Sequence, residues 1–231
     1  MKLLGILGGL GPLSSAYFYE LVTKHTKASR DQDHIDMIIS SRATTPDRTA
    51  FILGRSPEDP LPYMIEDAKR LEAYGADAIV IPCNTAHYFI GEVREAVNVP
   101  VPSIISETCE HVKRAGFKKA AILATEGTVS SRSYQNEFDS IGLNWAVPDA
   151  DGQAILMDII YGDVKRGVIP GREKLDAVID PLKREGCDCA VLACTELSLL
   201  TSRLGGDSFF VDSLEVLAEC AVRMFDKEYI P

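Results

Sequence analysis

Short apolar runs alternate along the whole chain with longer segments whose apolar residues recur at helical spacing. The apolar runs predict strands at residues 3–7, 35–40, 78–81, 120–124, 144–147, 190–193 and 209–212. The helical spacing predicts helices at residues 13–26, 63–74, 86–96, 131–141, 153–165 and 172–185, from about 198, and at 214–225. This alternation is typical of an α/β fold, in which parallel sheets carry helices on both faces.

Two pairs of segments indicate that the chain contains an internal duplication. GADAIVIPCNTAH (75–87) and GCDCAVLACTELS (186–198) share Gly, Asp, Val and Cys at an offset of 111 residues (194 minus 83). GILGGLGPLSS (5–15) and AILATEGTVSS (121–131) match at an offset of 116 residues (121 minus 5). The alternative is that any α/β protein repeats an apolar strand, a glycine turn and a polar helix start. Two collinear matches favour duplication, with a period too long for a solenoid.

The duplication predicts two pseudo-symmetric lobes, each a parallel sheet flanked by helices. We expect the first lobe at residues 1–104 and the second at 105–207, with residues 208–231 returning to the first lobe. The crossover between the lobes is expected at 99–107, a segment that contains two prolines.

Residues with chemical potential follow several of the predicted strands. Gly11, Cys83, Thr125 and Cys194 each come at or just after a strand end. Parallel sheets bind ligands beyond the carboxyl ends of their strands. We therefore expect the active site in the cleft between the lobes.

The composition excludes several classes of protein. The chain has 231 residues, 46% of them hydrophobic, and its net charge of −10 argues against a nucleic-acid-binding surface. No apolar run approaches the roughly 18–20 residues of a membrane span. The opening MKLLGILGGLGP is interpreted as a first buried strand with its glycine turn rather than a leader, so we expect a cytoplasmic protein without membrane partners.

Cofactor and metal motifs are not recognised in the chain. Ser14 stands where a GxGxxG turn needs glycine, and Pro12 interrupts the pattern, so a nicotinamide cofactor is not expected. The six cysteines are expected to be reduced, and they form no CxxC pair. The four histidines lack ligand spacing, so we expect no metal site.

Cys83 and Cys194 are the candidate catalytic groups. Both lie at strand-to-helix junctions, where free backbone N–H groups favour an anion and lower a thiol pKa. Inversion of a stereocentre by proton transfer needs a base on one face and an acid on the other, which one thiolate and one thiol provide. The alternative is that each is a small buried apolar residue. The equivalent positions of this pair favour catalysis, whereas Cys109, Cys187, Cys189 and Cys220 are expected to be packing residues.

Four segments carry a resemblance to a known family. PCNTAH (82–87), ACTEL (193–197), GGLGP (8–12) and ATEGTV (124–129) resemble the aspartate/glutamate racemase superfamily over essentially the whole chain, most closely the cofactor-independent aspartate racemases. The resemblance implies two pseudo-symmetric α/β lobes with the site between them, no pyridoxal phosphate, and a homodimer. It also implies that Cys83 and Cys194 transfer the protons.

The same resemblance points to the substrate-binding groups. Arg48 and Lys165 match the family's substrate-binding cations, which suits a small dicarboxylic amino acid; the alternative is two ordinary surface charges. Further candidate donors, each alternatively a helix cap or turn residue, are Gly11, Asn84, Thr85, Ala86, Thr125, Thr128 and Thr195. Glu196 either orients a catalytic thiol, takes the substrate ammonium, or is a first-turn acid favoured by the helix dipole.

The sequence thus predicts a racemase that interconverts L- and D-aspartate, or glutamate, with two cysteines and no cofactor. Alternatives within the superfamily are hydantoin racemisation, maleate isomerisation and decarboxylation of a malonate. A non-catalytic dicarboxylate-binding module and a pyridoxal enzyme are alternatives of other classes. The chain departs from the family pattern at Ala193, where glycine is common, and at Ser14 and Ser15.

Overall fold

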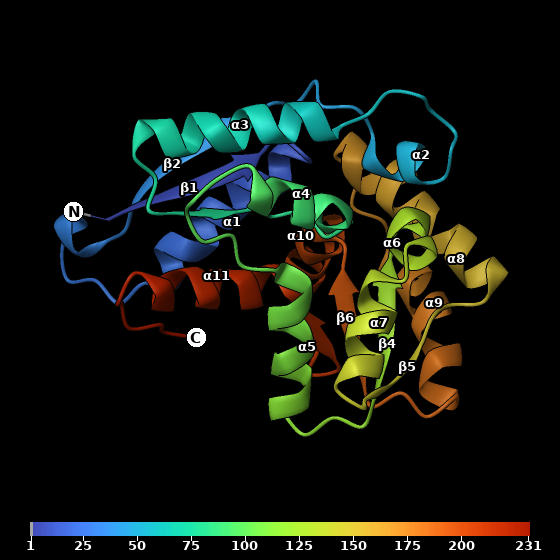
Figure 1. The fold of residues 1–231 in the computed structure, drawn as a ribbon. Helices are drawn as coiled ribbons and strands as arrows, with labels where there is room; N and C mark the ends of the chain where they lie inside the picture. Colours follow the sequence, from blue (N-terminus) through green and yellow to red (C-terminus); the bar gives the residue numbers. More distant parts are fainter. Residues whose placement is uncertain (1) are drawn as a thin grey trace.

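The computed structural model describes residues 2–231, which form two parallel sheets (Figure 1). The first sheet has the order β2-β1-β3 and consists of β1 (Leu3–Gly8), β2 (Asp36–Ser41) and β3 (Ala78–Val80). The second has the order β5-β4-β6-β7 and consists of β4 (Lys119–Ala124), β5 (Asn144–Ala146), β6 (Cys189–Ala193) and β7 (Phe210–Asp212). All neighbouring strands run parallel, which confirms the predicted two-lobed α/β fold.

Helices follow the strands throughout the described chain. The α-helices are α1 (Pro12–His25), α2 (Arg48–Ile52), α3 (Leu61–Tyr74), α4 (Ile90–Glu95), α5 (Ile104–Arg114), α6 (Glu126–Ser130), α7 (Ser133–Ser140), α8 (Ala150–Met157), α9 (Arg172–Arg184), α10 (Thr195–Leu204) and α11 (Ser213–Met224). Short 3₁₀ turns cover Asp31–Asp33, Thr85–Phe89 and Val164–Arg166, and a π-helical turn covers Asp158–Asp163. None of the helices in residues 2–231 is both long and apolar enough to cross a membrane.

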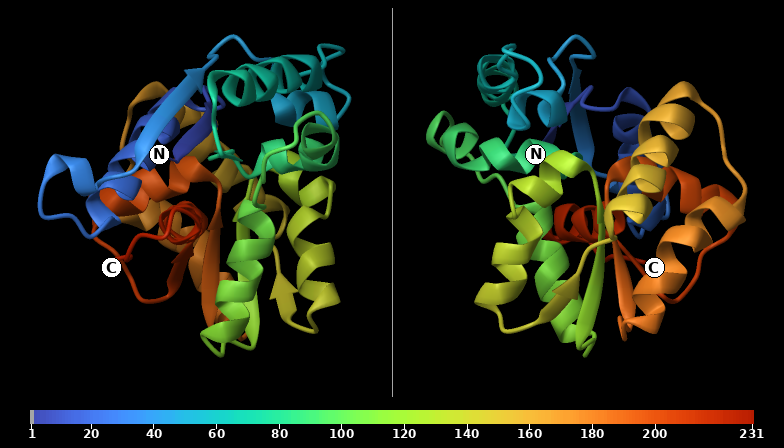
Figure 2. Two further views of the ribbon diagram at one scale, coloured as in Figure 1. Left: turned by 60° about the vertical axis from the view of Figure 1, so that its left-hand side comes forward. Right: turned by 90° about the vertical axis from the view of Figure 1, so that its right-hand side faces the viewer.

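Alternate residues of the second sheet pack into two different cores. Ala120, Ile122 and Ala124 of β4 lie in one core with α5, α7 and α11, whereas Ala121 and Leu123 pack against α9. Figure 2 shows these helices on either side of the sheet. Because both faces are covered, the strands are apolar at nearly every position. This explains why they appear in the sequence as continuous apolar runs.

The two lobes share a core. Leu4 and Ile6 of β1 belong to the same apolar cluster as α5, α11 and one face of β4. Helix α11 contacts both α1 and α5, and Figure 1 shows it running beneath the first lobe. The cysteine-bearing strands are therefore anchored to a common support.

Residues 208–231, which were expected to return to the first lobe, contact both lobes in the structure. Strand β7 pairs with β6 in the register Ala190↔Phe210 and extends the second sheet, so this strand does not return. The helix that follows it, α11, does contact α1 of the first lobe. A three-residue strand carries too little pattern to reveal which sheet edge it joins.

Three helices were not predicted. Helix α2 lies between the strand predicted at 35–40 and the helix predicted at 63–74, and it begins where the Asp47 carboxylate accepts the Ala50 N–H at 2.7 Å. Helix α5 occupies the expected crossover, and Ser103 caps it in the same way. Helix α6 begins at the Thr125 cap. Each start depends on one capping side chain in a short polar stretch, a weak signal beside apolar periodicity.

Candidate active site

Cys83 and Cys194 occupy equivalent positions in the two lobes. Cys83 follows β3 and precedes the 3₁₀ turn Thr85–Phe89, and Cys194 follows β6 directly and is the N-cap residue of α10. Both are buried, and both line the same pocket. The duplication in the sequence therefore corresponds to a real structural equivalence around one cavity.

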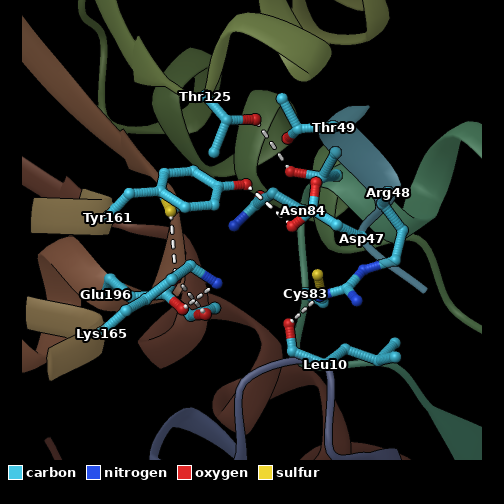
Figure 3. A pocket seen from close by; sticks show the side chains of 13 residues that line it. Leu10, Asp47, Arg48, Thr49, Cys83, Asn84, Thr125, Tyr161, Lys165 and Glu196 are labelled. Atoms are coloured by element: carbon cyan, nitrogen blue, oxygen red, sulfur yellow. Dashed lines mark hydrogen bonds and ion pairs between the residues drawn. The ribbon is translucent and has the colours of Figure 1, made fainter. Parts of the chain in front are cut away.

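Most of the candidate site residues line this pocket. The residues predicted and found there are Arg48, Cys83, Asn84, Thr85, Thr125, Lys165, Cys194, Thr195 and Glu196. Figure 3 shows Cys83 and Arg48 on one side, with Tyr161, Lys165 and Glu196 opposite.

Three candidates lie beside the lining rather than on it. Ala86 is fully buried in the core of the first lobe. The Thr128 hydroxyl is hydrogen-bonded to the hydroxyls of Thr85 at 3.0 Å and Thr125 at 3.2 Å. Gly11 lies against Glu196, where a Cβ atom would be 2.9 Å from Oε1. These three support the walls of the pocket.

A chain of polar contacts surrounds Cys194. Its thiol donates to Glu196 Oε2 at 3.1 Å, and Glu196 Oε1 pairs with Lys165 Nζ at 3.0 Å. Burial, and then the Glu196 carboxylate, raise the pKa of the Cys194 thiol well above its ordinary value, while Lys165 lowers it by less. Desolvation and the carboxylate therefore outweigh the helix N-terminus, which alone would lower this pKa. Cys194 is held as a neutral thiol.

The surroundings of Cys83 are different. The Cys83 carbonyl is 2.8 Å from Nδ1 of buried His87, whose Nε2 accepts the Ile104 N–H at 3.1 Å. An N–H only donates, so Nε2 carries no hydrogen and Nδ1–H donates to the carbonyl. Burial lowers the pKa of His87 to about 4, which keeps the ring neutral. A neutral imidazole thus fixes the backbone at Cys83 to the start of α5.

Arg48 is a buried cation without a carboxylate partner in the described chain. Its terminal nitrogens donate to the carbonyls of Leu10, Thr45 and Pro46, and its Nε is buried without a partner. An uncompensated buried charge is unfavourable by several kcal/mol, which a bound anion would offset. An anion bound in the pocket would therefore be stabilised at Arg48.

Lys165 differs from Arg48 because its charge is already paired. Burial lowers the pKa of its ammonium, but Glu196, Cys194 and Tyr161 raise it by more, so the group stays charged. The ammonium also lies 4.9 Å from the centre of the Tyr161 ring. An anion at Lys165 must share it with Glu196.

Contacts between the lobes close over the pocket at α2. The Tyr161 hydroxyl donates to Asp47 Oδ2 at 3.1 Å, and Arg55 forms an ion pair with Glu126 at 2.7 Å. At Gly127 a Cβ atom would lie 2.9 Å from the Cα of Thr49. Gly127 is the repeat equivalent of Gly11, so both recurring glycines stand where one lobe approaches the other.

Four pocket residues were missed: Leu10, Asp47, Thr49 and Tyr161. Leu10, Asp47 and Thr49 are direct neighbours of predicted residues, which is the signal that could have found them. Tyr161 precedes Lys165 by four positions and so lies on the same helical face.

The described residues do not form a cluster of metal ligands. In residues 2–231 no group of three or more His, Cys, Asp or Glu side chains is placed to hold a metal ion.

The glycine turn after β1 is tightly packed. At Gly9, with φ +81°, a Cβ atom would collide with the main chain of Arg42, and the Gly9 N–H donates to the Ser15 hydroxyl. The glycine turn therefore serves close packing within the first lobe.

Comparison with known proteins gives consistent matches. The model of the Asp/Glu/hydantoin racemase family matches residues 7–221. The structure titled Picrophilus torridus aspartate racemase has a TM-score of 0.86 and 30% identity, covering 100% of this chain and 96% of its own. An aspartate racemase homologue from Pyrococcus horikoshii OT3 has a TM-score of 0.79 and 26% identity, covering 98% of this chain and 100% of its own. A broad specificity amino-acid racemase of Bacillus subtilis is 28% identical, covering 96% of this chain and 98% of its own length.

Proposed function

The chain belongs to the Asp/Glu/hydantoin racemase family, and we propose that it interconverts L- and D-aspartate with two cysteines and no cofactor. The observation that carries this proposal is the pocket itself. Two thiols from equivalent strand ends line one cavity that also holds the Arg48 guanidinium, which has no carboxylate partner in the described chain. A racemase of this family acts on a small amino acid, and aspartate fits the two cations.

The proposed reaction is a proton exchange across the α-carbon. The thiolate of Cys83 takes the proton from one face, and the C–H electron pair stays on the carbon. The thiol of Cys194 gives its proton to the opposite face, which forms the new C–H bond. The cycle leaves Cys83 as thiol and Cys194 as thiolate, ready for the other enantiomer.

The protonation state of Cys194 supports this assignment of Cys83 as the base and Cys194 as the acid in the resting enzyme. Its pKa is raised by burial and by Glu196, so Cys194 is the acid in the resting state. Lys165, beside Glu196, stabilises the thiolate that forms once Cys194 has donated its proton. We therefore assign Glu196 the role of orienting Cys194, one of the three alternatives open from sequence.

The cations support an acidic substrate. Arg48 presents a buried Nε–H without a partner and is proposed to bind one carboxylate, while Lys165 binds the other. A second candidate function follows from the pairing of Lys165 with Glu196. If that pair stays closed, only one carboxylate anchor is free, and amino acids with a single carboxylate become substrates. The broad specificity of the Bacillus subtilis relative agrees with this candidate.

A deuterium-exchange panel tests the proposal. In deuterated water, L-aspartate should be converted to D-aspartate that carries deuterium at the α-carbon, with glutamate, alanine and lysine as comparison substrates. Cys83→Ala and Cys194→Ala should abolish turnover, and Cys220→Ala should not. Absence of exchange with every amino acid would refute the racemase assignment, and preference for alanine or lysine would replace aspartate by the second candidate.

The homodimer implied by the resemblance and the cytoplasmic location expected from the N-terminal segment stay predictions. Light scattering of the purified protein checks the first, and fractionation of the producing cells checks the second.

A further inference from the structure

A chain of three buried hydrogen bonds runs between the lobes, beside the thiols. The Tyr134 hydroxyl donates to Asn84 Oδ1 at 2.6 Å, and Asn84 Nδ2 donates to the Ser213 hydroxyl at 3.0 Å. The Ser213 hydroxyl donates to the Leu192 carbonyl at 2.7 Å. All four residues are at most 2% exposed, so water does not replace any of these partners.

The direction of every bond in this chain is determined. A carbonyl only accepts, so the Ser213 hydroxyl donates to Leu192 and accepts from the Asn84 amide. The carbonyl oxygen of Asn84 is then left to accept from Tyr134. Burial raises the pKa of Tyr134 well above its ordinary value, so the phenol keeps its proton and remains a donor. A buried polar chain satisfied in this way specifies one arrangement of its members.

The chain connects the two strand ends that carry the catalytic cysteines. Asn84 follows Cys83 directly and lines the pocket, where Figure 3 labels it. Leu192 lies in β6, two residues before Cys194. Tyr134 belongs to α7 and Ser213 is the first residue of α11, two helices in separate parts of the ribbon in Figure 1. These side chains thus brace the Cys83 segment against the Cys194 strand.

We infer that Tyr134 and Ser213 are positioning residues that act through Asn84 to set the separation and facing of Cys83 and Cys194. The inference rests on the proposed two-cysteine racemase function. Proton delivery to the opposite face needs both sulfur atoms within reach of one carbon, and a displacement of about 1 Å can reduce the rate 10²-fold. The two pocket cations do not bond to this chain, so substrate binding should be largely independent of it.

The test compares Tyr134→Phe and Ser213→Ala, which each remove one buried hydroxyl. Thr26→Val is the matched control, because the buried Thr26 hydroxyl also donates to a main-chain carbonyl, that of Val22 at 2.6 Å, at the far end of α1. In both variants we expect kcat for L- and D-aspartate to fall at least about tenfold. We expect KM to stay within about twofold, since Arg48 and Lys165 are untouched.

The distinctive readout is the fate of deuterium. When the second thiol is out of reach, a proton removed from one face is replaced on that face. Deuterium in recovered substrate, relative to deuterium in the inverted product, should therefore rise in Tyr134→Phe and Ser213→Ala but not in Thr26→Val. Wild-type values of kcat and of this ratio in both variants would overturn the inference.

A stability cycle keeps the two proposals separate. If the wild-type protein exchanges deuterium into no amino acid, the proposed function is refuted. The inference about Tyr134, Asn84 and Ser213 is then judged separately, by unfolding in urea. The Tyr134 and Ser213 hydroxyls both bond to the Asn84 amide. The urea midpoint of the double variant should therefore fall by less than the sum of the falls in the two single variants. Additive losses would overturn the inference, whatever the activity.

Discussion

The two cysteine-bearing strand ends share a position in the repeat but have different neighbours. Glu196 follows Cys194 at the position where Thr85 follows Cys83. The Glu196 carboxylate is bonded to the Cys194 thiol and to Lys165, whereas the Thr85 hydroxyl is bonded to Thr125 and Thr128. The backbone symmetry places the thiols, and this one exchange of side chain makes their electrostatics unequal.

The two cations of the pocket, Arg48 and Lys165, also differ in their neighbours. Arg48, on the Cys83 side, has no carboxylate partner in the described chain, while Lys165, on the Cys194 side, is paired with Glu196. A symmetric fold thus carries a cation without a carboxylate partner on one side and a protonated thiol on the other. The comparison teaches that duplication supplies two-sided geometry, and local substitution makes the two sides chemically different.

Removal of the unpaired cation should have the largest effect. Arg48→Met should lower kcat/KM for aspartate on the order of 10³-fold, because two charge-assisted hydrogen bonds to a carboxylate are lost. Steady-state kinetics should show most of the loss in KM, without a shift in the pH profile. Lys165→Met should change both KM and the pH profile, since it also touches Glu196. An unchanged KM in Arg48→Met would contradict the role of Arg48.

Removal of the Glu196 carboxylate should make the two cysteine-bearing strand ends chemically more alike. Glu196→Gln keeps an acceptor for the thiol but loses the charge, so the pKa of Cys194 should fall. We expect racemisation to drop on the order of 10²-fold. Alkylation of Cys194 by iodoacetamide, followed by mass spectrometry of the peptide, should begin at lower pH. Cys83 provides the internal control, and an unchanged Cys194 profile would refute the assignment.

The support of Cys83 should be sensitive to acid. The pKa of His87 in the folded state is lowered to about 4, below its ordinary 6.5, so its contribution to stability is present above about pH 6.5 and lost toward pH 4. The loss amounts to up to about 3 kcal/mol of unfolding free energy. Urea unfolding at pH 7.5 and 4.5 should show a greater loss of unfolding free energy in the wild type than in His87→Gln.

Asp212 provides the opposing control for that experiment. Burial raises its pKa to about 6, so its contribution is present at low pH and is lost as the pH rises through 6. Asp212→Asn should therefore steepen the loss of stability on acidification. Equal pH dependence in the wild type and His87→Gln would show that His87 is not the titrating group.

The hydroxyl cluster beside Cys83 should contribute least. Thr85→Val breaks two hydrogen bonds of 3.0 Å, to Thr125 and Thr128, and should lower kcat/KM by roughly tenfold or less. Thr128→Val should give the same loss, because the three hydroxyls are bonded to one another. A Thr85→Val loss as large as that of Glu196→Gln would mean that the two ends are not chemically different.

The position of the thiols could be predicted from sequence because it depends on local patterns. An apolar strand followed by cysteine and small polar residues occurs twice, and parallel topology brings such ends to one side of a sheet. The strands and most helices followed from the same apolar periodicity.

The pairing of charges could not be predicted in this way. Lys165 and Glu196 lie 31 positions apart (196 minus 165), and their ion pair depends on how the turn Val164–Arg166 packs beside α10. The raised pKa of Cys194 follows from burial and from the Glu196 carboxylate, so the sequence pattern could not predict it either. The contact of Tyr161 with Asp47 joins different lobes and has no local signal.

The initial-rate partition of deuterium during racemisation of L-aspartate tests the two-cysteine mechanism most directly. With one thiol on each face, deuterium should appear at the α-carbon of newly formed D-aspartate while recovered L-aspartate stays nearly unlabelled. Equal early labelling of both enantiomers would indicate a single base serving both faces and would contradict the account.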